Sequence, residues 1–335
     1  MNVLELTRSL VDIESITNNE MQVGSYLFDC VSKLARNTGG RAERMEVEAD
    51  RFNVLAYWGD PAVTLSTHMD TVPPFFASRE DSDCVWGRGS CDAKGIAASM
   101  ICAAETLLAE GVRNFALLFL VGEERNSTGA YAAARSPCGS RYLINGEPTG
   151  NKLALASKGA LRLELRAHGT AAHSAYPELG KSAIDDLLDA LEKIRRIPLP
   201  KDGLLGSCTL NIGTISGGRA PNVVPDCARA EILVRLVGDP GPVRAALAAA
   251  ASGHTEVKEI LCAPTVHFER VDGFPTTIVS YTTDVPALGV SWGKPFLIGP
   301  GDILVAHTAE ERVHKKELSD AIGIYADLVR RLLAG

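Results

Sequence analysis

Residues 115–126 read FALLFLVGEERN, an apolar run that ends in two adjacent glutamates, Glu123 and Glu124. A short continuous apolar run is typical of a strand that is buried on both faces, as in a parallel sheet covered by helices. Residues 140–148, SRYLINGEP, have the same form and end near Glu147. We therefore predict two buried strands, each followed directly by carboxylates.

The surrounding sequence alternates between strand-like and helix-like segments. Residues 52–59 and 63–70 are predicted strands, and residues 93–110 form a predicted helix that Gly111 ends. Residues 1–20 are expected to form an amphipathic helix. Such β-α-β alternation favours an α/β fold with a mostly parallel sheet. Ligands bind beyond the carboxyl ends of the strands in such sheets, where His68, Glu123, Glu124 and Glu147 are expected.

The pattern changes at residue 159. Residues 160–169 (ALRLELRAHG) alternate with period two, as in a sheet with one solvated face. A helix at 181–196, strands at 208–218 and 228–238, a helix near 240–252 and a strand at 255–262 follow. The order β-α-β-β-α-β is that of a ferredoxin-like α+β unit. After Pro264 the α/β pattern returns, through strands at 278–284 and 295–302 to a helix at 317–333. We predict an inserted domain at 159–265, within a larger domain formed by 1–158 and 266–335.

Composition excludes several classes of protein. The chain has 335 residues, 34 basic and 41 acidic, and a net charge of −7, which disfavours binding to nucleic acids or anionic membranes. No apolar run approaches the roughly 20 residues of a membrane helix, and the first residues do not resemble a signal peptide. A cytoplasmic location is expected. The eight cysteines form no C-x-x-C pair, so most are expected to be reduced and buried.

Five segments carry imidazole and carboxylate groups at predicted strand ends and loops. They are THMDTVP with His68 and Asp70, GRGSCDAKG with Asp92, VGEERN with Glu123 and Glu124, INGEPTG with Glu147, and VAHTAEE with His307. Each has an ordinary alternative: a strand-end histidine, a helix-capping aspartate, or a solvated glutamate pair. Together they suffice for two divalent metals and leave one glutamate free as a base, as amide hydrolysis by metal-activated water requires.

Other residues are less informative. Cys91 stands beside Asp92, and His173 (GTAAHSAYP) belongs to the predicted insertion. No context assigns a role to His168, His254, His267 or His314. No G-x-G-x-x-G follows the first strand, so a dinucleotide-binding enzyme is set aside.

Taken in order, these segments resemble the metallohydrolase family of acetylornithine deacetylase, succinyl-diaminopimelate desuccinylase, aminoacylase and glutamate carboxypeptidase (peptidase family M20). The resemblance rests on H-x-D-x-x-P, G-R-G-x-x-D-x-K-G, E-E, G-E-P-T and the late histidine, and covers essentially the whole chain. It implies a zinc-peptidase-like catalytic domain with a mixed, mostly parallel sheet, and an inserted dimerisation (lid) domain.

The resemblance also implies a role for each residue. His68 and Glu147 would bind one zinc ion, Glu124 and His307 the other, and Asp92 would bridge them. Asp70 would orient His68, and Glu123 would be the general base. His173 would donate a hydrogen bond to the oxyanion in the partner's site of a homodimer. Co²⁺ or Mn²⁺ can replace zinc at such sites. Substrate contacts are expected from Asn222, Arg235, Tyr176, Lys158 and Gly301.

The substrate that the resemblance favours is an N-acyl amino acid, with N-acetylornithine as the first choice, which would place the enzyme in arginine or lysine biosynthesis. The alternatives are a succinyl-diaminopimelate desuccinylase, a hydrolase releasing lysine or ornithine from a carrier protein, an aminoacylase, and a dipeptidase or tripeptidase. A non-catalytic binding relative would lack a ligand or the base, and none is missing.

Overall fold

The computed structural model describes residues 1–251, 253 and 255–335, which divide into two compact units. Unit 1 contains Met1–Leu155, Phe268–Thr277 and Thr283–Gly335, and unit 2 contains Ala156–His267 and Ile278–Thr282. Each unit has its own apolar core. Unit 2 therefore also includes the short segment 278–282, which the sequence pattern assigned to the second part of the larger domain.

Unit 1 is built on a six-stranded sheet in the order β1-β2-β6-β3-β7-β17. Strands β6, β3, β7 and β17 are parallel to one another, and β2 is antiparallel to both of its neighbours, β1 and β6, which confirms a mixed, mostly parallel sheet. The bounds are β1 Arg41–Glu48, β2 Arg51–Trp58, β3 Val63–His68, β6 Phe115–Leu120, β7 Tyr142–Asn145 and β17 Lys294–Leu297. All residues of β3 and β6 are buried, as expected for continuous apolar strands.

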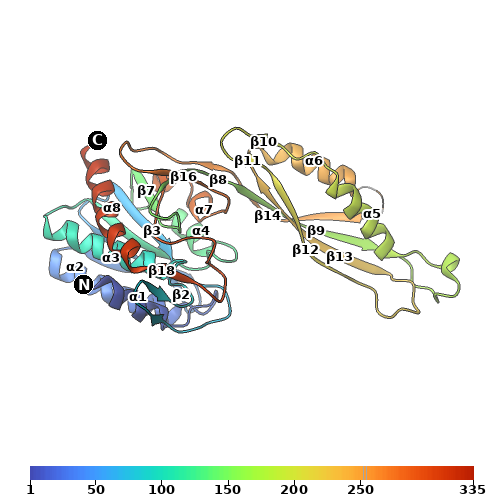
Figure 1. The fold of residues 1–335 in the computed structure, drawn as a ribbon, viewed down its shortest axis with the longest axis horizontal. Coiled ribbons are helices and arrows are strands. Elements are labelled where there is room, and N and C mark those ends of the chain that lie inside the picture. The colour runs from blue at the N-terminus through green and yellow to red at the C-terminus, as the bar shows by residue number, and fades with distance from the viewer. Residues whose placement is uncertain (252, 254) are drawn as a thin grey trace. The chain divides into compact units, whose positions relative to one another are not determined.

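The helices of unit 1 pack against this sheet and against one another. They are α1 Val3–Val11, α2 Met21–Thr38, α3 Lys94–Ala109, α4 Thr128–Ala134, α7 Val285–Leu288 and α8 Lys315–Ala334, with a 3₁₀ turn at Val290–Trp292. Helix α3 contacts α1, α2 and α8, and Figure 1 shows α2, α3 and α8 lying together. Most of α3 is buried, and its small residues, such as Ala97, Ala98 and Ala103, allow close helix packing.

Three predicted elements are wrong in extent, and one of them, the strand predicted at 295–302, already ends at Leu297 as β17. The N-terminal helix ends at Val11 instead of continuing to residue 20, because the chain then runs beside Thr71. There, Thr71 N–H donates to Ser15 O at 2.9 Å and Thr17 N–H donates to Thr71 O at 3.2 Å. The strand predicted at 278–284 is shorter and displaced, to β16 Thr276–Val279.

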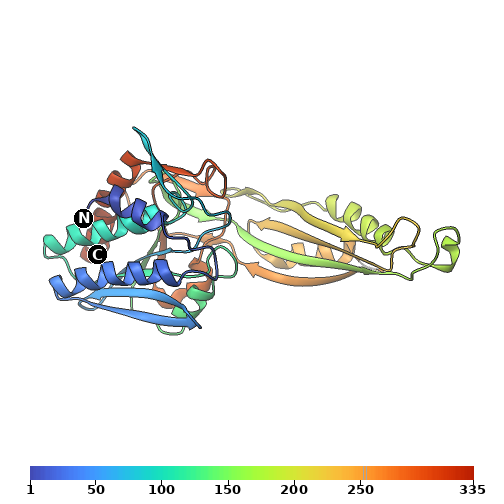
Figure 2. The ribbon, with the colours of Figure 1, turned by 90° about the horizontal axis from the view of Figure 1, so that it is seen from below.

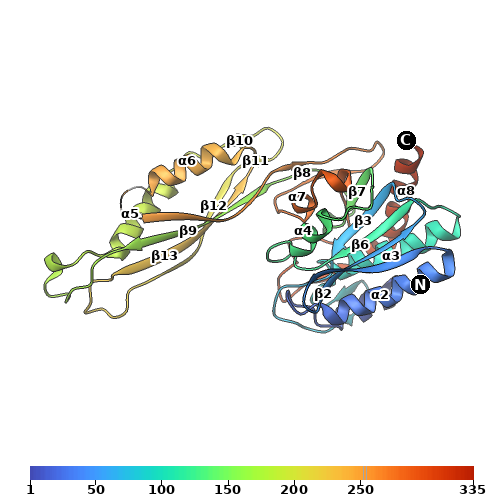
Figure 3. The same ribbon diagram turned by 180° about the vertical axis from the view of Figure 1, so that it is seen from behind.

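Unit 2 contains the four-stranded antiparallel sheet β12-β13-β9-β14 and two helices. The elements follow the chain as β9 Gly159–His168, α5 Ala183–Arg195, β12 Thr209–Gly217, β13 Cys227–Leu236, α6 Pro240–Ala250 and β14 Thr255–Ala263. This is the β-α-β-β-α-β order of a ferredoxin-like unit. Helices α5 and α6 cover one face (Figures 1 and 3), and Figure 2 shows the opposite face.

The remaining elements are short. A three-stranded sheet joins β18 Arg312–His314, β5 Cys84–Trp86 and β4 Arg79–Glu80, and another joins β15 Val266–His267, β8 Leu153–Ser157 and β16. Strands β10 Lys201–Asp202 and β11 Gly206–Ser207 pair, and a 3₁₀ turn spans Pro177–Leu179. Among the described residues, no helix is long and apolar enough to span a bilayer. All eight cysteines are free thiols; four are buried, three are half-buried and Cys227 is exposed.

Candidate metal centre

Three neighbouring strands of unit 1 bring the predicted site residues to one edge of the sheet. His68 is the last residue of β3, Glu123 and Glu124 follow the end of β6, and Glu147 follows the end of β7. In the sheet, His68 is opposite Leu120 of β6, and Ser66 is opposite Asn145 of β7. Because these strands are parallel and adjacent, their carboxyl ends gather the side chains beyond one edge, as the sequence pattern predicts.

Asp92 and His307 reach the same place from loops. Asp92 Oδ1 lies 2.9 Å from His68 Nε2, and Asp92 Oδ2 lies 3.3 Å from His307 Nε2. The same His307 nitrogen lies 3.0 Å from the carboxylate of Glu124. One ligand atom from each of His68, Asp92 and Glu124 lies within 4.8 Å of the others, so these residues could hold a metal ion.

Glu147 adds a carboxylate with an unsatisfied oxygen. Its side chain is 4% exposed, and its Oε1 atom has no hydrogen-bond partner among the described residues. Burial raises the pKa of Glu147 well above its usual value, and the charge of Asp92 adds to the increase. A buried carboxylate oxygen without a donor is costly unless a cation compensates it.

Asp70 holds both His68 and the turn that carries the two glutamates. His68 Nδ1 is 3.1 Å from the backbone oxygen of Asp70 and 3.6 Å from its carboxylate. The Asp70 carboxylate accepts hydrogen bonds from the backbone N–H groups of Glu123 and Glu124, at 3.1 and 3.2 Å, and from the hydroxyl of Thr17 at 2.7 Å. Asp70 therefore positions the Glu123–Glu124 turn as well as the imidazole.

The electrostatics of the cluster follow from burial and crowding. Burial, reinforced by the charge of Glu147, raises the pKa of Glu123 well above its usual value. Burial would lower the pKa of His68, but the carboxylates of Asp70 and Asp92 raise it overall. Hydrogen bonds to Asp92 and Glu124 raise the pKa of His307 to about 10. These carboxylates outnumber the imidazoles, so the site attracts cations.

Gly301 is the one predicted substrate contact in unit 1. The structure explains why this position is a glycine. Its φ of +97° lies in the left-handed region, and an added Cβ would stand 2.6 Å from the sulfur of Cys91. Cys91 is buried, and burial raises the pKa of its thiol well above the usual value. The two residues therefore pack backbone against side chain beside Asp92.

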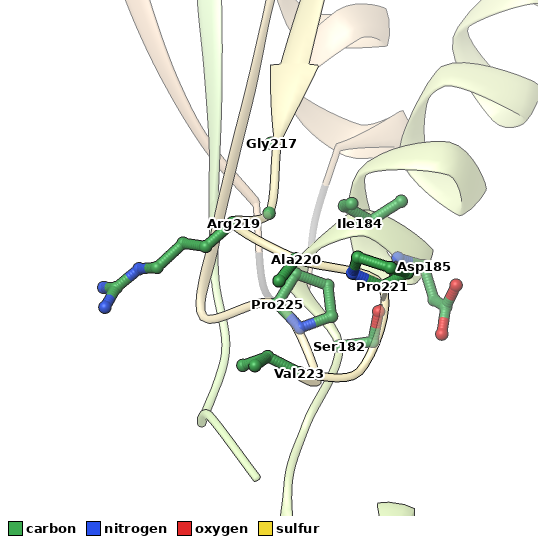
Figure 4. Close-up of a pocket in the computed structure, with 10 residues that line it drawn as sticks. Ser182, Ile184, Asp185, Gly217, Arg219, Ala220, Pro221, Val223 and Pro225 are labelled. Carbon is green, nitrogen blue, oxygen red and sulfur yellow. Dashed lines mark hydrogen bonds between the residues drawn. The ribbon is translucent and has the colours of Figure 1, made fainter. Parts of the chain in front are cut away.

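In unit 2, three of the predicted residues lie together. The backbone of His173 bridges that of Val223, Ser174 N–H donates to Asn222 O at 3.0 Å, and the rings of His173 and Tyr176 are 6.3 Å apart. Figure 4 shows the adjacent pocket, between the start of α5 and the loop 217–225. None of the predicted site residues, all of which the structure describes, lines this pocket.

The other two predicted residues of unit 2 lie elsewhere in it. Arg235 is near the end of β13, opposite Ala160 of β9, whereas Asn222 precedes the start of β13 at Cys227. The eight residue steps from Cys227 to Arg235 span about 26 Å of strand. Lys158 is buried, and its Nζ donates to Ser207 O at 2.7 Å.

Sequence reasoning missed two buried carboxylates of unit 1. Asp284, at the start of α7, is 1% exposed and has no hydrogen-bond partner on either oxygen among the described residues. Burial raises its pKa to about 7. Glu311, four residues after His307, contacts the backbone of Asp92. In the sequence, these residues belong to the TTD and HTAEE segments, where they cannot be distinguished from ordinary surface acids. Only their burial in the structure distinguishes them.

Three of the four unassigned histidines are described, and they lie outside the cluster. His314 Nδ1 is 3.3 Å from the sulfur of Cys84, His168 ends β9 and His267 ends β15. His254 lies outside the described residues.

Comparison with known proteins identifies the family. Residues 64–331 match peptidase family M20/M25/M40. A probable carboxypeptidase of Aspergillus flavus is 38% identical over 373 residues, covering 98% of this chain and 89% of the relative. A Staphylococcus aureus tripeptidase has a similar fold, with a TM-score of 0.81, 20% identity, and coverage of 100% of this chain and 98% of that chain. A Bacillus subtilis protein described as a dinuclear metal-binding M20 peptidase has a TM-score of 0.68 at 16% identity, with coverage of 97% and 96%. The chain therefore belongs to peptidase family M20/M25/M40 and is a metal-dependent hydrolase.

Proposed function

We propose that this protein is a two-metal exopeptidase that hydrolyses a short peptide, with carboxypeptidase activity as the first choice. The observation that carries the proposal is the cluster of His68, Asp92 and Glu124, whose ligand atoms lie within 4.8 Å, joined by His307. The name of the fungal relative favours a carboxypeptidase, and the fold resembles that of a tripeptidase. N-acetylornithine, which the sequence alone favoured, ranks behind peptides because these comparisons do not support a deacetylase or a role in arginine or lysine biosynthesis.

The donor set fits two divalent ions. We infer that His68 and Glu147 would hold one ion, Glu124 and His307 the other, and Asp92 both. Imidazole and carboxylate ligands suit zinc, and also cobalt or manganese. The unpartnered Oε1 of Glu147 and the Asp92 carboxylate, shared between two imidazoles, support this assignment. When bound, such ions polarise the scissile carbonyl and make water a better nucleophile at neutral pH.

Glu123 is our proposed general base. No described residue hydrogen-bonds to its carboxylate, whereas its backbone N–H is held by Asp70. Its neighbour Glu124 contacts His307, so the two adjacent glutamates have different surroundings. A carboxylate with a raised pKa can take a proton from water and later give it to the leaving amine.

We further propose that the protein works as a homodimer in which His173 acts at the partner's site. The chain enters and leaves unit 2 near Gly159 and Ala263, which are close in the sheet, whereas His173 lies near the opposite end of β9. Strand β12 is an exposed edge of the sheet and could pair with another chain. A hydrogen-bond donor at an oxyanion is worth about 3–4 kcal/mol.

The dimer proposal is tested by complementation. Homodimers of His173→Ala and of Glu123→Gln should both be nearly inactive, but mixed dimers should regain activity, because one of their two sites has both residues intact. Mixed dimers without activity would contradict a role in trans.

Substrate class is tested with matched peptides, in protein loaded with Zn²⁺ or Co²⁺. A carboxypeptidase should cleave an N-acetylated tripeptide with a free carboxyl terminus and should not cleave its C-terminal amide. A dipeptidase or tripeptidase should require the free amino group instead. N-acetylornithine, N-succinyl-diaminopimelate and N-acetylmethionine complete the panel. Faster cleavage of any of these than of the peptides would overturn the peptidase assignment.

A further inference from the structure

Glu311 is a buried acid that connects the two loops of the metal cluster. It is 1% exposed and lies between His307 and the start of β18 at Arg312. It is not among the proposed ligands. Its carboxylate instead faces the loop 87–92, which carries Asp92.

One oxygen of Glu311 gathers several backbone donors of that loop. Oε1 accepts hydrogen bonds from the N–H groups of Gly89 at 2.8 Å, Asp92 at 3.2 Å and Cys91 at 3.4 Å. Convergent N–H groups on one carboxylate oxygen define the path of a loop, because each bond fixes a different peptide plane. The backbone of Asp92 is among those fixed.

The other oxygen forms a buried ion pair with Arg88. Arg88 is 2% exposed, its Nε donates to Pro74 O at 3.2 Å, and its guanidinium lies 4.8 Å from the ring centre of Phe76. Arg88 is therefore itself held in place. A buried pair of this kind contributes little net stability on its own, so a role in geometry is a better explanation for it.

Strand pairing brings Glu311 to this loop in a defined register. Arg312 of β18 pairs with Trp86 of β5, and Gly87 N–H donates to the backbone oxygen of Glu311 at 3.1 Å. The residue before β18 therefore lies beside the residues after β5. His307 and Asp92 lie beyond this junction on either side, with His307 Nε2 and Asp92 Oδ2 3.3 Å apart.

We propose that Glu311 is a positioning residue that holds the Asp92 loop against the His307 loop in the geometry that binds metal. This inference rests on the metal site proposed above. Loss of the acceptor at residue 311 should weaken metal binding by about 10- to 100-fold, as is usual when a group that orients a ligand is removed.

Two double variants separate the positioning of the Asp92 loop by Glu311 from the effect of leaving a buried charge without its partner. Arg88→Gln with Glu311→Gln removes both charges and keeps an acceptor oxygen, whereas Arg88→Gln with Glu311→Leu removes the acceptor as well. We measure Zn²⁺ and Co²⁺ affinity by competition with a chromophoric chelator, and the rise in Tm on adding metal. The leucine variant should bind at least about 10-fold more weakly than the glutamine variant and show a smaller rise in Tm. Glu310→Gln, at an exposed neighbour, is the control.

Equal metal affinity in the two double variants would overturn the proposal. If the leucine variant does not fold, Glu311→Asp takes its place: it keeps a charge for Arg88 but withdraws the oxygens from the loop, and wild-type metal affinity would again overturn the proposal. If the wild-type protein binds neither ion, the proposed metal site itself is refuted. This outcome differs from failure of the present inference alone, in which the wild type binds metal and the two double variants bind it equally well.

Discussion

The two histidines of the cluster are held in different ways. His68 is the last residue of a buried strand, is 1% exposed, and is fixed by the hydrogen bonds of β3 to β6 and β7. The side chain of His307 is 51% exposed and belongs to an irregular loop, with φ at +64°. The sheet therefore orders one end of the site when the chain folds, whereas loop contacts order the other. We infer that the two metal ions bind with unequal affinity, more tightly at the His68 end.

The largest effect is expected from His68→Ala. This change removes the imidazole between the buried carboxylates of Asp70 and Asp92, which repel one another without it. We expect metal to be lost during dialysis and hydrolysis to fall to background. Elemental analysis of the dialysed protein checks this, and retention of the wild-type metal content would refute the ranking of the two ends.

A smaller loss is expected from His307→Ala. The half-exposed end should lose its metal on dialysis while the ion at the His68 end stays, because His68, Asp92 and Glu147 are intact. Titration with Zn²⁺ should then show one tight site in place of two. If both ions are lost together, the two ends are not independent and the comparison fails.

Asp70→Asn should reduce activity or metal affinity by about 10- to 100-fold, because the carboxylate accepts hydrogen bonds from the Glu123–Glu124 turn and its charge lies 3.6 Å from His68 Nδ1. The asparagine side chain has a single acceptor oxygen, so it cannot accept hydrogen bonds at both of the positions that the two carboxylate oxygens occupy. Thr17→Val, which removes only one of the bonds to Asp70, is the matched control and should have a smaller effect. Equal losses in the two variants would assign the effect to packing instead of the carboxylate.

The last effect is on stability alone and leaves the proposed ligands unchanged; it acts through Asp284. Its pKa in the folded protein is about 7, against 3.8 ordinarily, so between these pH values the folded state binds more protons than the unfolded state. The free energy of unfolding of the metal-free protein should therefore fall as pH rises from about 4 to about 7. Asp284→Asn should be more stable than the wild type at pH 8, by up to about 4 kcal/mol at 1.4 kcal/mol per pKa unit, and should gain little at pH 4. Urea unfolding at both pH values checks this; a gain that is independent of pH would contradict it.

The sequence predicted the sheet end of the site better than the loop end. An apolar run such as 115–120 is a strong local signal for a buried strand, so the strand ends at which His68, Glu123, Glu124 and Glu147 lie could be placed. The contacts of Asp92 with His307 join residues 215 apart in the chain, and no local pattern encodes them. Glu311 and Asp284 were missed because burial of an acid depends on tertiary packing. The end of the N-terminal helix was placed too late because pairing with Thr71 outweighs helical periodicity after Val11.

The most direct test of the two-metal mechanism is the Glu123→Gln variant, assayed for turnover and metal content in the same preparation. The amide keeps the size of the side chain but cannot take a proton from water. Turnover should fall by about 100- to 10,000-fold, the usual contribution of a general base, while two metal ions per chain remain bound. Turnover within a few-fold of the wild type, or loss of metal with the change, would contradict the assignment of Glu123 as a base that does not bind metal.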